Sequence, residues 1–155
     1  MLKIVRRDMT GVGNPELKDD PIIGPLFSAA GVVFLEREGI MDADGAREAL
    51  EPAVRALCQG RSIAIAPEGT RSLTPRLGAF KKGAFHLAME AGVPIVPVVF
   101  RNVLDAYPKN ARVVRPATIE AIVLPPIDTR DWTREDIPER VDAIRSGYLE
   151  ILRQD

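Results

Sequence analysis

Short apolar runs alternate along this chain with amphipathic segments, and this alternation limits the folds available to it. Four runs have the length and apolar, β-branched content of strands: residues 31–35 (GVVFL), 62–66 (SIAIA), 94–100 (PIVPVVF) and 118–124 (TIEAIVL). A shorter strand is predicted at residues 9–13, and the runs at 31–35 and 62–66 are expected to be buried. Strands that alternate with helices are typical of an α/β fold.

Helical patterns fill the intervals between these strands. They cover residues 21–30, 43–59 and 82–91, and residues 1–7 have the character of the last turns of a further helix. Pro52 lies inside the second segment, where an interior proline costs about 3 kcal/mol, so we expect a kink or a break there. Gly60 and Gly92 follow the second and third segments and are predicted to be their C-terminal caps.

The clearest helical pattern is at the end of the chain. Apolar residues recur there at spacings of three and four: Ile137, Val141, Ile144, Tyr148 and Ile151. Thr133 is a candidate cap, with Asp136 three residues later. We interpret this segment as a closing helix that packs on the sheet. A helix on a membrane surface is the alternative, although the mixed acidic and basic outer face disfavours it.

The composition suits one globular domain spanning residues 1–155, with 46% hydrophobic and 28% charged residues. The net charge of −1 provides no excess of Lys and Arg for neutralising phosphates, which argues against a nucleic-acid partner. A single cysteine, Cys58, excludes an internal disulfide and fits a reducing cytoplasm. No apolar run approaches the roughly 20 residues needed to span a bilayer.

The segment after the 62–66 run carries the strongest chemical signal. Its sequence, APEGTRS at residues 66–72, places Glu68, Gly69, Thr70 and Arg71 at the carboxyl end of a predicted strand. Ligands of α/β sheets bind at such ends, and a guanidinium group matches a phosphate with two parallel hydrogen bonds. An ionised Glu68 cannot contact a phosphate directly, so we expect it to orient Arg71 or a lysine, or to accept from a substrate hydroxyl.

Two further groups of cations extend this hypothesis. Lys81 and Lys82 open the 82–91 helix, where backbone N–H groups and the helix dipole favour anions. Arg37 follows the 31–35 run, and it would meet Arg71 at one edge of the sheet if the two strands were parallel neighbours. A solvated surface turn with an incidental Glu–Arg pair remains open on spacing alone. A P-loop is not supported, because GAFKKG lacks the G-x-x-x-x-G-K-[ST] arrangement.

The chain resembles the glycerophospholipid (lysophosphatidic acid) acyltransferase family in three blocks. Residues 31–37 (GVVFLER) are similar to a block usually written G-x-x-F-I-D-R, and residues 93–98 (VPIVPV) to a later one. PEGTRS is similar to a block that Phe normally precedes, where this chain has Ala66. The segments ELKDDP and GAFKKG also match. The resemblance covers essentially the whole chain and implies a mixed, largely parallel sheet flanked by helices, as in glycerol-3-phosphate acyltransferase.

The resemblance also implies an activity. In the family, the histidine of an H-x-x-x-x-D motif is the general base that activates a glycerol hydroxyl, which attacks the thioester of acyl-CoA or acyl carrier protein. The residues implied to hold the substrate phosphate are Arg37, Glu68, Gly69, Thr70 and Arg71, with possible contacts from Lys81 and Lys82. No metal or cofactor is required. A lysophospholipid substrate implies peripheral membrane contact, which we expect at the cytoplasmic, inner face.

The catalytic motif itself is not found in this sequence. The single histidine is His86, and the residue five positions later is Ala91 rather than Asp. We therefore expect His86 to be an ordinary helix residue and the motif to lie upstream of Met1, which makes this an N-terminally truncated, inactive chain. A non-catalytic module that binds lipid phosphate or CoA, and an unrelated α/β phosphate-binding protein, remain open.

Overall fold

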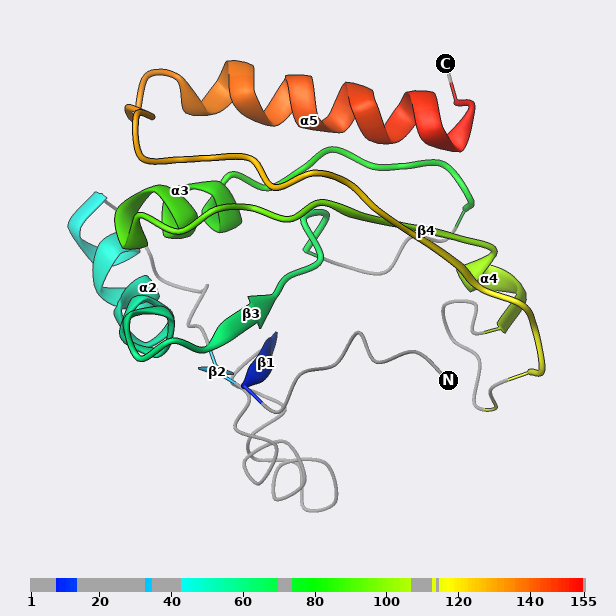
Figure 1. Cartoon of the computed structure of the whole chain (residues 1–155), viewed down its shortest axis with the longest axis horizontal. Helices are drawn as coiled ribbons and strands as arrows, with labels where there is room; N and C mark the ends of the chain where they lie inside the picture. Colours follow the sequence, from blue (N-terminus) through cyan, green and yellow to red (C-terminus); the bar gives the residue numbers. More distant parts are fainter. Residues whose placement is uncertain are drawn as a thin grey trace. The chain divides into compact units, whose positions relative to one another are not determined.

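The computed structural model describes residues 8–13, 33–34, 43–69, 74–106, 113 and 115–154 (Figure 1). The chain divides into two compact units, Met1–Ile65 and Ala66–Asp155. The predicted helix at residues 21–30 and the helix end at residues 1–7 lie outside the described residues. One domain over residues 1–155 stays a prediction.

Three parallel strands form the sheet of the first unit. They are β1 (Met9–Gly13), β2 (Val33–Phe34) and β3 (Ser62–Ala64), with β1 in the centre. The register pairs Thr10 with Ile63 and Val12 with Val33. All three predicted strands are therefore confirmed. However, β1 lies between β2 and β3. The two strands are therefore parallel but not adjacent, whereas the predicted meeting of Arg37 and Arg71 assumed parallel neighbours.

Strand β3 is shorter and more exposed than predicted. It ends at Ala64, and its side chains alternate, with Ser62 and Ala64 exposed and Ile63 half-buried. Because successive side chains of a strand point to opposite faces, this alternation means that one face is covered and the other is not. The prediction of a fully buried strand is wrong for β3.

Helix α2 (Ala43–Cys58) runs through Pro52 without a break, so the predicted break is wrong. A kink at Pro52 stays a prediction. The residues after the proline hold the helix in place, because Ala53 and Ala56 are buried and α2 packs on β2 and β3. The end of the helix is as predicted. Gly60 has a φ of 80°, and the N–H groups of Gly60 and Arg61 donate to carbonyl groups of the last turn.

In the described part of the second unit, an antiparallel strand pair is combined with helices. The elements are α3 (Gly83–Ala91), β4 (Val98–Arg101), α4 (Val103–Ala106), β5 (Glu120–Val123) and α5 (Ile137–Leu152). Both strands are shorter than predicted. Pro94 and Pro97 have no N–H group to donate, although the carbonyl of Pro97 still accepts from Leu124 N–H at 2.9 Å. The short helix α4 was not predicted.

Helix α5 closes this unit over an aromatic and aliphatic core, as predicted. It packs on β4 and α3 (Figure 1). Ile137 and Val141 are buried with Phe80 and Phe85, and the Tyr148 ring meets Phe80 edge-on at 5.3 Å. Since this apolar face is inside the unit, the alternative of a membrane-surface helix is wrong. No helix among the described residues is long and apolar enough to cross a membrane.

The start of α5 differs from the predicted cap. Thr133 lies in a preceding turn, where its N–H and hydroxyl groups donate to Asp136 Oδ2 at 2.8 and 2.9 Å. The backbone hydrogen bond from Thr133, followed by the one from its hydroxyl, lowers the pKa of the Asp136 carboxyl. The helix begins only at Ile137, and Pro138, which has no N–H to satisfy, suits its first turn.

Candidate functional site

Residues Ala66, Pro67, Glu68 and Gly69 form a β-turn directly after the apolar run. The N–H of Gly69 donates to the Ala66 carbonyl at 3.0 Å, and Pro67 occupies the second position, where its fixed φ is favourable. Glu68 does not adopt a positive φ, which excludes a type II turn. Gly69 has a φ of 71°, a conformation that favours glycine. The proline and the glycine of APEGTRS thus determine the backbone path.

The carboxylate of Glu68 contributes to closing the loop that follows. Its Oε2 accepts a hydrogen bond from Gly78 N–H at 2.8 Å, and the N–H of Lys81 donates to the Pro67 carbonyl at 2.7 Å. The described residues 74–81, which we call the loop, are therefore tied to Pro67 and Glu68 at two points. This backbone partner of Glu68 was not predicted, and the expected contact with Arg71 stays a prediction.

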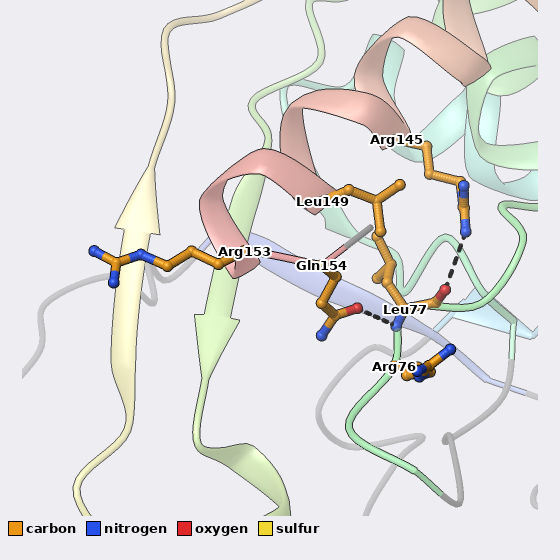
Figure 2. Close-up of a pocket in the computed structure, with 6 residues that line it drawn as sticks. All are labelled: Arg76, Leu77, Arg145, Leu149, Arg153 and Gln154. Carbon is orange, nitrogen blue, oxygen red and sulfur yellow. Dashed lines mark hydrogen bonds between the residues drawn. The ribbon is translucent and has the colours of Figure 1, made fainter.

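Helix α5 holds the same loop from another direction. Arg145 donates through Nε to the Gly78 carbonyl at 2.9 Å and through Nη2 to the Leu77 carbonyl at 3.1 Å. The Gln154 side chain accepts from Leu77 N–H at 2.8 Å and donates to the Pro75 carbonyl at 2.7 Å. Figure 2 shows Arg145, on the helix, and Gln154, just past its end, both reaching Leu77. The sequence carried no signal for these residues, because they lie 67 to 79 positions from their partners.

A pocket of about 390 Å³ lies at this junction of loop and helix. It is lined by Arg76, Leu77, Arg145, Leu149, Arg153 and Gln154. Although three of these residues are arginines, the Arg153 side chain points away from Arg76 and Arg145 in Figure 2. The three guanidinium groups therefore do not converge on one anion.

Lys81 and Lys82 lie at the start of α3, as predicted, and both are exposed. Lys82 is the cap residue, and its carbonyl accepts from the N–H groups of Phe85 and His86. The two ammonium groups therefore face solvent beside the N-terminal turn of the helix, where an anion is favoured. Whether they contact a substrate stays a prediction.

His86 is a half-buried residue of α3. Its pKa is lowered, chiefly because burial disfavours the charged imidazole and secondly because Arg134 and Lys82 are nearby cations, while Glu90 acts in the opposite direction. Ala91 stands where the family motif would place its aspartate. The interpretation of His86 as an ordinary helix residue is therefore retained.

The remaining predicted site residues cannot be placed. Arg37, Thr70 and Arg71 lie outside the described residues. Cys58, at the end of α2, is exposed. Within the described ranges, no group of three or more His, Cys, Asp or Glu residues is arranged to hold a metal ion.

The contact between Glu68 and Gly78 generates a testable prediction. A Cβ atom at Gly78 would lie 2.8 Å from Glu68 Oε2, so Gly78→Ala should displace the carboxylate. We expect a loss of about 1 kcal/mol in the free energy of unfolding in urea, typical of one partly exposed hydrogen bond. Gly147→Ala is the matched control. It adds a methyl group to α5 with no atom within 4 Å and should stabilise the protein. Equal stability of Gly78→Ala and wild type would show that the carboxylate is not needed there.

Comparison with known proteins places these features in a family. Residues 1–101 match the family model Acyltransferase. The chain is 37% identical over 126 residues to the 1-acyl-sn-glycerol-3-phosphate acyltransferase alpha of Mus musculus, covering 81% of this chain and 44% of the relative. It is 36% identical over 143 residues to the 1-acyl-sn-glycerol-3-phosphate acyltransferase of Limnanthes douglasii, covering 92% and 50%. The chain thus spans about half the length of these relatives.

The fold also matches a solved structure. The crystal structure of the 1-acyl-sn-glycerophosphate (LPA) acyltransferase PlsC from Thermotoga maritima aligns with a TM-score of 0.70 and 24% identity, covering 93% of this chain and 57% of that protein. This likeness shows the fold, and the predicted mixed α/β class is confirmed. Since the family model matches more than half of its residues, the chain belongs to the Acyltransferase family.

Proposed function

We propose that this chain forms the phosphate-binding part of an enzyme that acylates the free hydroxyl of 1-acyl-sn-glycerol 3-phosphate (lysophosphatidic acid) in phospholipid synthesis. The observation that carries the proposal is the family match, because residues 1–101 include both the 31–37 and the 67–72 blocks. The names of the relatives supply the acceptor.

In this proposal the cations of the two blocks bind the phosphate. Arg37 and Arg71 donate paired hydrogen bonds to its oxygens, and Lys81 and Lys82 add positive charge at the start of α3. The geometry of the described residues supports this role. Gly69 turns the chain with a φ of 71° immediately before Thr70 and Arg71, which lets the backbone come close to a ligand.

The reaction is an acyl transfer that needs no metal or cofactor. The acceptor hydroxyl loses its proton to a base as its oxygen attacks the thioester carbonyl. The carbon–sulfur bond then breaks, and the thiol of CoA or of acyl carrier protein leaves with a proton. Binding of the phosphate holds the hydroxyl near the thioester, and such positioning lowers the barrier by up to several kcal/mol.

We further propose that these 155 residues alone bind the acceptor without transferring the acyl group, since they contain no H-x-x-x-x-D sequence. Incubation with acyl-CoA and lysophosphatidic acid should therefore release no CoA above the background hydrolysis. Steady release that depends on lysophosphatidic acid would contradict this statement. A chain that binds lysophosphatidic acid but stays inactive within its complete native protein would instead support the alternative, a non-catalytic binding module.

Peripheral contact with a membrane, at its cytoplasmic face, is part of the same proposal. The lysophospholipid acceptor and the product both reside in a bilayer, so the site must reach lipid at the membrane surface.

The test of phosphate binding is Arg71→Ala. We expect this change to weaken binding of a short-chain lysophosphatidic acid, used below its micelle concentration, by roughly 10- to 100-fold, because hydrogen bonds to charged groups contribute about 1.5–3 kcal/mol. Isothermal titration calorimetry measures the affinity. The matched control is Arg55→Ala, which removes an exposed arginine paired with Glu51. The monoacylglycerol without phosphate should bind wild type and Arg71→Ala equally weakly. Unchanged affinity in Arg71→Ala would point to an unrelated phosphate site.

A further inference from the structure

We infer that α5 and the residues just after it position Glu68 of the proposed phosphate site. Arg145 of α5 and Gln154, just past its end, fix residues 75–78, and this segment in turn fixes Glu68. The inference rests on the proposed function, because it concerns the loop that follows Glu68-Gly-Thr-Arg. Neither side chain is proposed to touch the substrate. Both are positioning residues.

Gly78 is the point through which the two parts are connected. Its N–H donates to Glu68 at 2.8 Å, and its carbonyl accepts from Arg145 at 2.9 Å. The peptide group between Leu77 and Gly78 is therefore held at both ends, by Arg145 at the Leu77 carbonyl and by Glu68 at the Gly78 N–H. A shift of Arg145 moves the Gly78 carbonyl, and the N–H that anchors the carboxylate moves with it.

Gln154 holds the loop at a second place, just before Gly78. Its amide uses both of its ends, accepting from Leu77 N–H and donating to the Pro75 carbonyl. With the Leu77 carbonyl bound by Arg145 at 3.1 Å, the side chains of Arg145 in α5 and of Gln154, just past its end, hold four backbone groups of residues 75–78. These backbone groups thereby have partners in a segment without regular secondary structure.

Contacts outside residues 75–78 also anchor the helix. Tyr148 accepts from Val98 N–H at 3.1 Å, and the Arg101 guanidinium donates to the Ile151 carbonyl. Ile137 and Val141 are buried in the core of the unit. Because α5 is fixed by these contacts, it is a rigid support for the loop.

The experiment compares Arg145→Gln and Gln154→Ala with a charge-matched control. Arg153→Gln removes the same charge from the same pocket, yet its side chain points away from the loop (Figure 2). Arg145→Lys is the conservative variant, since an ammonium group can still donate to one carbonyl. Amide hydrogen exchange at Gly78 reports the order of the loop, and titration with short-chain lysophosphatidic acid and with its monoacylglycerol reports binding.

We expect Arg145→Gln and Gln154→Ala to speed exchange at Gly78 while exchange within α3 stays slow. Both should weaken binding of the phosphorylated lipid by about tenfold, the equivalent of one hydrogen bond, without affecting the monoacylglycerol. Arg145→Lys should recover part of the loss, and Arg153→Gln should match wild type.

Three results would overturn the inference. They are unchanged exchange at Gly78, faster exchange with unchanged affinity, and equal losses in Arg145→Gln and Arg153→Gln, which would indicate a purely electrostatic effect. If Arg145→Gln does not fold, Gln154→Ala decides the same question. If wild type does not bind the phosphorylated lipid, the proposed function fails, while the exchange data still decide whether α5 orders the loop.

Discussion

The conformation of the loop in the second unit depends on hydrogen bonds to the backbone of residues 75–78. These bonds come from Arg145 of α5 and from Gln154, just past the end of the helix. Arg145 and Gln154 reach across more than 60 positions of sequence to bind carbonyl and N–H groups that no strand or helix satisfies. A backbone polar group buried without a partner is costly, so the loop can be compact only where such partners exist. The loop conformation therefore depends on the helix that closes the unit.

The residues that hold the loop in place differ from those proposed to bind the phosphate. Arg145 and Gln154 bind only backbone atoms, and the Glu68 carboxylate also binds a backbone N–H. In the proposed function, other side chains, such as Arg71, bind the phosphate. Binding residues on loops are effective when a rigid scaffold positions them, because less ordering is then required when the ligand arrives.

Much of the fold could be predicted because its signals are local. The apolar period of α5, the glycine after α2 and the short apolar runs each reflect backbone geometry within a few residues. The surface turn that was left open for APEGTRS also reflects local geometry, and residues 66–69 form a β-turn. Pro52 misled the prediction because local helix preference ignores packing, and buried Ala53 and Ala56 hold α2 together beyond it. Helix α4 is too short to show a period.

The chemistry proposed for the site follows from the sequence and stays a prediction, whereas the hydrogen bonds that connect its residues could not be predicted. A glutamate beside Gly-Thr-Arg indicated anion recognition, yet nothing near Glu68 identified Gly78 as its partner. Arg145 could not be distinguished from the other charged residues on α5, since all of them follow the same amphipathic pattern. Long-range contacts of this kind depend on how the elements pack, which a local pattern does not contain.

The measurement that tests the account most directly is a series of amide NMR spectra of the isotope-labelled chain titrated with short-chain lysophosphatidic acid. The account predicts that the largest shifts occur at residue 37, at residues 69–71 and at the start of α3, and that the monoacylglycerol without phosphate does not cause them. Shifts that appear elsewhere in the chain, or that are the same for both lipids, would contradict the claim that this loop recognises the acceptor phosphate.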